Sequence, residues 1–212
     1  MFFSAYRLVQ SFLALSIAVF VICLAIIITL SFTPLYYFDI WHLQIANESG
    51  FSHEQIVENY NYVIAYLLNP FPQPFELPSL AYSNGGRIHF QEVKRIFTAV
   101  EVLLGLAALS SAFGIWKMTR IRDFFPLKRA AVFLTLFTII PLLLFAMDFN
   151  GTFILFHRIF FRNNYWIFDP AADPIIRILP ETFFLHAALL ILGIIGFGII
   201  TMIFTYRKCV AK

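Results

Sequence analysis

The sequence has few charged residues. Asp, Glu, Lys and Arg make up 13% of its 212 residues, whereas 60% are hydrophobic. Soluble domains carry roughly 25% charged residues, so this composition excludes an ordinary soluble domain and indicates an integral membrane protein. Glycine and cysteine are also scarce, with nine and two residues. The chain has no Gly-rich phosphate loop, internal repeat or paired Cys/His metal motif.

Four apolar runs approach the length of about 20 residues that is needed to cross a bilayer. They cover residues 8–32, 96–116, 130–147 and 183–206. We therefore predict an all-α integral membrane protein with four transmembrane helices, in which residues 1–212 form a single membrane domain. The first run follows Arg7 as a signal sequence would, but no small-x-small cleavage pattern precedes Pro34. We expect an uncleaved anchor.

The positions of Lys and Arg predict the orientation. Residues 117–129 hold five of the fifteen, whereas residues 33–95 and 148–182 hold three each. Because these cations accumulate in cytoplasmic loops, we expect residues 117–129 and both termini to be cytoplasmic and the two longer segments to be extracytoplasmic. Cys23 then lies in a span and Cys209 in the cytoplasmic tail, so no disulfide is expected. The basic residues cluster only where the predicted topology requires them, so nucleic acid is not a predicted partner.

The two outer segments have the patterns of ordered structure and are predicted to form a cap. Ser52 and Gln55 have capping-box spacing, and apolar residues recur at helical intervals as far as Leu68. This helix should lay its apolar stripe on the membrane surface or on the other outer segment. Asn84 and Gly85 predict a tight turn before the second span. Asp169-Pro170 and Asp173-Pro174 are typical of helix starts.

Two histidines from distant parts of the chain are predicted at the same membrane depth. If residues 152–162 are helical, His157 faces aromatic rings, while Arg158 and Arg162 lie one turn apart and face lipid headgroups. His89 approaches the same leaflet at the start of the second span. Such histidines are either solvated interfacial side chains or a catalytic pair. Glu92, three residues after His89, could orient its imidazole or be an exposed charge.

Other polar residues are weaker candidates. Glu101 falls inside the second span, where it needs a partner or a polar cavity unless it reaches the interface. His186 is expected to be a packed donor and His42 and His53 to be surface residues. Trp166 is typical of interfacial aromatics. A metal site built from His89, His157 and a carboxylate lacks the i, i+4 spacing of a zinc helix, so we predict neither a metal nor another cofactor.

Two stretches resemble a known family. They are "GGRIHFQEVKRIF", residues 85–97, and "HRIFFRNNYWIFDPAADPIIRILPETFF", residues 157–184. Together with the predicted topology, they are similar to the lipoprotein intramolecular transacylases of Gram-positive bacteria. One departure is Glu92, where an aspartate would be expected in the family's "HxxDVK"-like run.

The resemblance implies an enzyme of the bacterial cell membrane whose active site faces the extracytoplasmic side. Its substrates would be diacylated lipoproteins among the membrane lipids. The sn-2 acyl chain would move to the α-amino group of the N-terminal cysteine, giving the N-acylated lyso-form. The catalytic histidines of the family map onto His89 and His157. Residues expected to support them or bind substrate are Glu92, Arg158, Arg162, Asn163, Trp166 and Asp173.

Two other classes of protein remain open at this stage. One is a non-enzymatic four-span sensor or carrier that binds a lipid or peptide between its outer segments and tolerates loss of either histidine. The other is a metal-dependent membrane hydrolase, which a chelator would inactivate.

Overall fold

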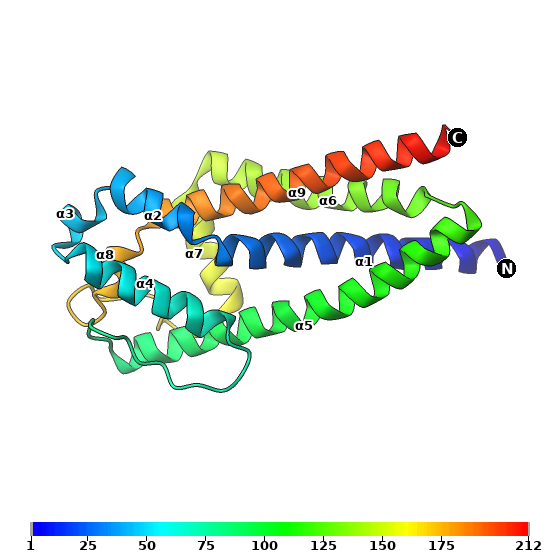
Figure 1. Ribbon diagram of the computed structural model, residues 1–212. Coiled ribbons are helices and arrows are strands. Elements are labelled where there is room, and N and C mark those ends of the chain that lie inside the picture. Colours follow the sequence, from blue (N-terminus) through cyan, green and yellow to red (C-terminus); the bar gives the residue numbers. More distant parts are fainter. Residues whose placement is uncertain (1, 212) are drawn as a thin grey trace. The chain divides into compact units, whose positions relative to one another are not determined.

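The structure is a computed structural model that describes residues 2–211, with side chains from residue 5 onward. Between these limits it is helical and contains no strand. The helices are α1 (Phe2–Ser31), α2 (Thr33–His42), α3 (Ile45–Ser49), α4 (His53–Leu68), α5 (Asn84–Ile121), α6 (Phe125–Met147), α7 (Phe149–Phe160), α8 (Ile175–Ile178) and α9 (Glu181–Val210) (Figure 1). The predicted all-α class is confirmed.

Four helices of the described chain are long and apolar enough to cross a membrane. They are Ala5–Ser31 within α1, together with α5, α6 and α9. Large apolar side chains stay exposed along them, as on α5, where Leu106 is 62% and Leu109 73% exposed. Such surfaces are costly in water and ordinary in lipid. The prediction of four membrane helices is confirmed.

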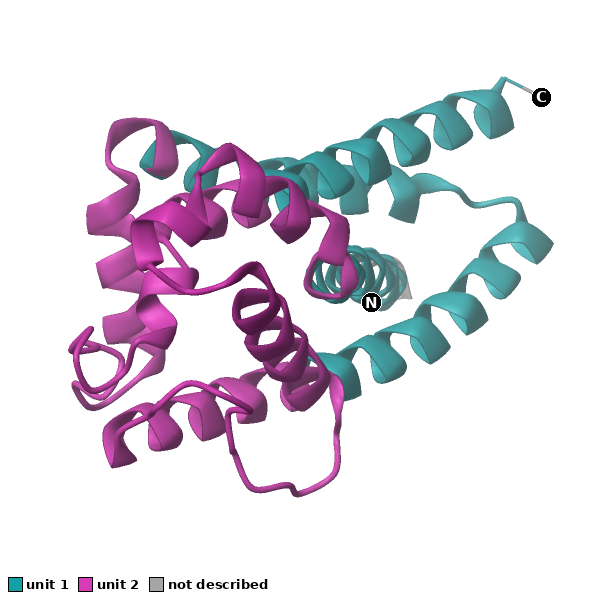
Figure 2. Cartoon of the chain, turned by 60° about the vertical axis from the view of Figure 1, so that its left-hand side comes forward, with its two compact units in different colours: residues 1–28, 100–144, 189–212 teal, residues 29–99, 145–188 magenta. Residues whose placement is uncertain are grey.

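The chain divides into two compact units (Figure 2). The first comprises Met1–Ile28, Val100–Leu144 and Leu189–Lys212. Its core uses small residues where helices approach closely, such as Ala14 and Ala18 of α1 and Ala130 of α6, which are at most 3% exposed. Small side chains allow this approach between membrane helices, where packing replaces the hydrophobic effect. Cys23 is also buried, as expected of a small apolar side chain.

One group of polar contacts in the first unit lies at the connection between α5 and α6. Asp123 accepts hydrogen bonds from Tyr6 Oη at 2.5 Å and Gln10 Nε2 at 2.6 Å. Arg129 donates to Ser11 Oγ at 2.9 Å. The connection is therefore bound to the first turns of α1.

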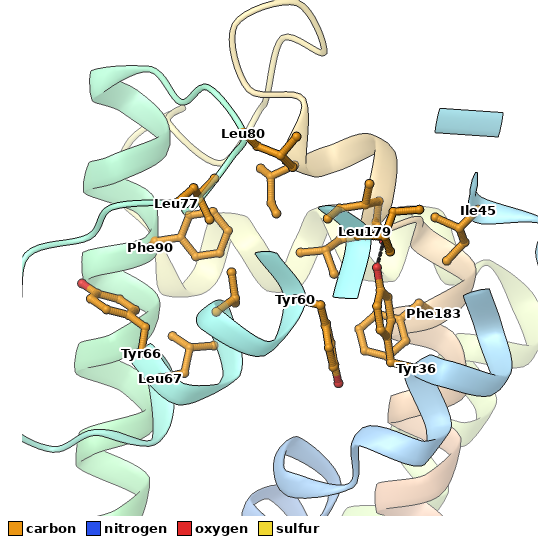
Figure 3. Packing of buried hydrophobic residues seen from close by; sticks show 14 of the residues in the cluster. Tyr36, Ile45, Tyr60, Tyr66, Leu67, Leu77, Leu80, Phe90, Leu179 and Phe183 are labelled. Carbon is orange, nitrogen blue, oxygen red and sulfur yellow. Dashed lines mark hydrogen bonds between the residues drawn. The ribbon is translucent and has the colours of Figure 1, made fainter. Parts of the chain in front are cut away.

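The second unit comprises Thr29–Ala99 and Phe145–Ala188. Its core is rich in rings: Tyr36 stacks on Tyr60 with ring centres 3.7 Å apart, and Phe183 meets Tyr36 edge-on at 5.1 Å. The Tyr36 hydroxyl donates to the carbonyl of Ile178 at 2.6 Å (Figure 3). Burial raises the pKa of both tyrosines, so they stay neutral donors.

Helix α4 is confirmed as the amphipathic helix expected from the sequence. Ser52 and Gln55 form the capping box, and the buried apolar residues of α4 pack with Ile175 and Ile178 of α8. Its stripe thus lies on the other outer segment, one of the two predicted alternatives. Asn59, fully buried, donates to Ser79 Oγ at 2.6 Å and accepts from the Leu80 amide at 3.3 Å, which fixes the proline-rich segment to α4.

Candidate active site

His89 lies in the second turn of α5, within the second unit. Ser83 accepts a hydrogen bond from the Gly86 amide at 2.9 Å, and its own amide donates to Asp173 Oδ1 at 2.7 Å. The predicted tight turn at Asn84 and Gly85 is wrong, because these residues begin α5 instead. Ser83 supplies the capping acceptor that a helix start needs, so the chain is already helical at this point.

Gly86 permits a close approach at this helix start. A Cβ atom on Gly86 would lie 2.2 Å from Asp173 Oδ1, so only glycine leaves room for the carboxylate. Asp173 is 4% exposed, and its negative charge lies at the positive end of the helix dipole. The loop before α8 is thereby attached to the helix that carries His89.

His157 lies on α7, which begins after Asp148. The Asp148 side chain accepts from the Gly151 amide at 2.9 Å and caps the helix. His157 Nδ1 lies 2.7 Å from the carbonyl oxygen of Phe153. Because a carbonyl only accepts, Nδ1 carries the proton. The neutral ring therefore presents an unprotonated Nε2, the form that accepts a proton.

The two imidazoles are neighbours, with ring centres 6.0 Å apart and planes inclined by 34°. Phe161 lies beside both, 4.7 Å from the ring of His89 and 5.6 Å from that of His157. Trp166 lies 4.9 Å from His157, and Phe168 lies 5.4 Å from His89. His89 is 7% exposed. The pair is thus surrounded mainly by aromatic surface.

This environment favours a neutral His157. Burial lowers its pKa below the usual value of 6.5, although the hydrogen bond to the Phe153 carbonyl acts in the opposite direction. Removing water from around an imidazole penalises the charged form. His157 is therefore neutral at neutral pH, with its ring proton on Nδ1.

Asn163 connects the two sequence regions of the site. Its Nδ2 donates to Glu92 Oε1 at 2.8 Å, its side-chain oxygen accepts from the Tyr165 amide, and its carbonyl accepts from Trp166 Nε1 at 3.0 Å. The second oxygen of Glu92 and Nδ1 of His89 are buried and have no hydrogen-bond partner. Glu92 thus holds Asn163, and the suggestion that it orients His89 through a direct hydrogen bond is wrong. Trp166 contacts His157 directly and is more than an interfacial ring.

The two arginines are not arranged as predicted. Arg158 is exposed on the last turns of α7, but α7 ends at Phe160, so Arg162 lies in the following irregular segment. The carbonyl of His157 accepts from the Phe161 amide and ends the helix at this point. Their expected i, i+4 relation on one helix is therefore wrong, although both side chains are exposed.

His186 is a hydrogen-bond donor, as expected, but its partner was not predicted from the sequence. His186 Nδ1 lies 2.8 Å from Asp39 Oδ1 and 3.0 Å from Oδ2, and Asp39 is fully buried. His42 is 6.2 Å from His186 between ring centres. Nothing in the spacing of residues 39 and 186 indicates this pair, because it depends on how α2 packs on α9. The expectation that His42 and His53 are exposed is confirmed.

Comparisons with known proteins identify the family. The model of the lipoprotein intramolecular transacylase family, Lit, matches residues 11–184. The chain belongs to this family. A solved structure of the membrane-integral lipoprotein intramolecular transacylase Lit from Bacillus cereus is 34% identical, with a TM-score of 0.94, over 97% of this chain and 95% of that one. No curated protein matches the sequence.

Two further solved structures of the Bacillus cereus transacylase match at a TM-score of 0.88 and 33% identity, covering 99% of this chain. They cover 95% and 96% of the matched chains, and each carries a substitution of one histidine, by arginine or by alanine. The chain is thus a multi-pass membrane enzyme, a lipoprotein intramolecular transacylase. The non-enzymatic carrier and the metal-dependent hydrolase are not the functions of this family.

The transacylase shows no cluster of three or more His, Cys, Asp or Glu side chains able to hold a metal ion among its described residues. His89 and His157 have no carboxylate as a hydrogen-bond partner in that part of the chain.

Proposed function

We propose that His89 and His157 are the catalytic residues of the transacylase. The reaction moves the sn-2 acyl chain of the diacylglyceryl group to the α-amino group of the lipoprotein's N-terminal cysteine, which gives the lyso-form. The observation that carries the proposal is the 6.0 Å separation of two imidazoles inside an aromatic surround. The ester and the amine of one lipoprotein are proposed to bind next to both rings.

In the proposed mechanism, His157 is the general base. The amine has a pKa of about 7.7 to 8.0, so a neutral fraction is present near pH 7. Its nitrogen attacks the ester carbonyl and then passes a proton to His157 Nε2, which is unprotonated because Nδ1 donates to Phe153. The same proton goes to the glyceryl oxygen as the ester bond breaks. One C–N bond forms and one C–O bond breaks, so no cofactor or nucleotide is consumed.

His89 is proposed to stabilise the tetrahedral intermediate. A neutral imidazole keeps one N–H group, and a donor aimed at the developing oxyanion lowers the barrier most where water is excluded. His89 is 7% exposed among Phe161, Phe168 and Phe90, which excludes most water from one side of the ring. Donor and acceptor are parts of one lipoprotein, so proximity contributes to the rate.

The supporting residues are proposed to act by position and charge. Asn163, held by Glu92, carries Trp166 against His157, and Asp173 fixes the start of the helix that bears His89. Arg158 and Arg162 are exposed cations, and a guanidinium suits phosphate or carbonyl oxygens at the headgroup level. Neither arginine is proposed to transfer a proton.

The histidine proposal is tested with a purified diacyl lipopeptide and mass spectrometry of its N-terminal cysteine. His157→Ala and His89→Ala should each lower conversion by about 10² to 10⁴, the usual contribution of acid–base catalysis. His53→Ala, on an exposed histidine, is the matched control and should convert at the parental rate. Parental conversion by folded His89→Ala and His157→Ala would refute the proposal.

We further propose that both termini are cytoplasmic and that the histidine site faces the extracytoplasmic side. The proposal rests on the Lys and Arg of residues 117–129. Cysteines introduced at Glu48 and Ala171, both exposed, should react with an impermeant thiol reagent in intact cells. A cysteine at Thr119, in a chain without Cys23 and Cys209, should stay protected. The reverse labelling pattern would overturn the orientation.

A further inference from the structure

A cavity in the second unit lies away from the histidines. Its volume is about 400 Å³, and it is lined by Tyr66, Pro70, Phe71, Pro72, Gln73, Gln91, Lys94, Arg95 and Thr98. At about 100° per residue, Lys94 and Thr98 lie about 140° and 180° around α5 from His89. The cavity therefore opens on the opposite face of α5, and a ligand bound there would not occupy the proposed active site.

The charge of the cavity is positive. Of the described residues that line it, Lys94 and Arg95 are cations and none is a carboxylate. Lys94 is only 8% exposed, with its ammonium 4.3 Å from the ring centre of Tyr66. A cation withdrawn from water acts more strongly on a nearby anion than a solvated one does. Arg95 is exposed on the same face of α5, so its guanidinium can reach a ligand directly.

The rim of the cavity is held in place before any ligand binds. Asn69 accepts from the Phe71 amide at 3.0 Å and donates to Gln73 Oε1 at 2.7 Å. That bond uses the acceptor of Gln73, so the N–H groups of its amide remain available as donors. Pro70 and Pro72 restrict the backbone on each side of Phe71. Figure 3 shows Tyr66 beside the α5 ribbon, where it forms the inner wall.

The surroundings favour a lipid over a free anion. Phe71, between two prolines at the rim, is 72% exposed, which suits contact with the interfacial layer of a bilayer. Thr98 lies near the start of the apolar run at residues 96–116 of α5, which Glu101 interrupts. The cations are therefore at the level at which lipid phosphates lie.

We propose that this cavity binds the phosphate of an anionic phospholipid as a bound lipid distinct from the substrate. Arg95 donates to the phosphate oxygens, Lys94 supplies charge from the wall, and Gln73 and Gln91 contribute further hydrogen bonds. The lipid would connect α4, the proline-rich segment and α5. This inference does not depend on the roles proposed for the histidines.

The test is native mass spectrometry of the full chain in detergent with added phosphatidylglycerol, which is anionic, or phosphatidylcholine, which is zwitterionic. The parent should bind one phosphatidylglycerol in preference to phosphatidylcholine. Arg95→Gln should weaken that binding by about tenfold, the effect of losing one charge-assisted hydrogen bond. Arg87→Gln removes the same charge from an exposed position of α5 outside the cavity and should bind as the parent does.

Two further measurements separate the alternatives. Lys94→Gln should also weaken phosphatidylglycerol binding, whereas transacylation by Arg95→Gln should stay at the parental level, because Arg95 faces away from His89. Inorganic phosphate alone is the second arm of the titration. If phosphate displaces the lipid in an Arg95-dependent way at equal concentration, the site binds a free anion and the lipid assignment is wrong. Undiminished lipid binding by Arg95→Gln, or an equal loss in Arg87→Gln, would also overturn the proposal.

Discussion

His89 and His157 form one pair of neighbouring imidazoles and His42 and His186 form another, with ring centres 6.0 and 6.2 Å apart. Both pairs belong to the second unit, and their partners differ. His186 binds the fully buried carboxylate of Asp39, whereas His157 binds the backbone carbonyl of Phe153. Similar spacing thus occurs in two electrostatic environments.

The difference separates a structural histidine from one suited to proton transfer. The buried carboxylate of Asp39 accepts a hydrogen bond from His186 and fixes its ring. A backbone carbonyl fixes the ring and selects the tautomer, but it adds no full charge. His157 therefore keeps a neutral ring with an unprotonated Nε2, while the Asp39–His186 pair joins α2 to α9.

The largest expected effect is a loss of stability when the Asp39–His186 pair is broken. In His186→Ala, Asp39 keeps its position at 0% exposure without its partner, and removal of one member of a buried pair costs about 3 to 5 kcal/mol. The His186 side chain is 26% exposed, so the lower end of this range is expected. Reversible unfolding in detergent measures the change in free energy.

His42→Ala is the matched control for that experiment, because His42 is exposed and has no carboxylate partner in the described chain. Its unfolding free energy should stay within about 0.5 kcal/mol of the parent. Folded His186→Ala protein should keep most of its specific activity. Equal stability of the two variants would mean that Asp39 and His186 do not form a structural pair.

A smaller effect is expected from a substitution near the His89–His157 pair that changes neither histidine. In Gly86→Ala, the new Cβ would lie 2.2 Å from Asp173 Oδ1, so the loop before α8 must move away from α5. Overpacking of this kind costs about 1 to 3 kcal/mol. Gly105→Ala adds the same methyl group to α5 with no atom within 4 Å and should not destabilise the chain. A parental melting temperature for Gly86→Ala would contradict the close contact.

The sequence predicts the parts of this protein that local chemistry determines. The four spans follow from apolar length, and the start of α4 follows from Ser52 and Gln55, because neither depends on distant residues. The Asn84-Gly85 turn failed because Ser83 caps a helix there and Asp173, ninety residues away, binds the Ser83 amide. A turn signal from two residues cannot include that long-range acceptor.

The candidate site was predictable in its residues and only partly in its contacts. His89 and His157 were predicted at the same membrane depth, but their direct contact depends on the packing of α5 with α7. Glu92 was paired with His89 because helical spacing was the only relation visible in the sequence, whereas its partner is Asn163. Asp39 was missed because a single Asp in "FDIWH" carries no sign of burial or of His186.

The smallest expected effect is a pH dependence of stability that comes from His157 of the first pair. Burial lowers the pKa of His157 below 6.5 in the folded chain, so the unfolded chain takes up a proton first as the pH falls. The neutral ring of His157 therefore makes its full contribution to the stability of the folded chain above about pH 6.5. That contribution decreases as the pH falls below this value. Melting temperatures of the parent and His157→Gln, measured from pH 7.5 to 5.5, test this sign. The parent should lose stability relative to His157→Gln on acidification. If the parent instead gained stability relative to His157→Gln at low pH, the folded chain would favour a charged His157, and its role as the base at neutral pH would have to be abandoned.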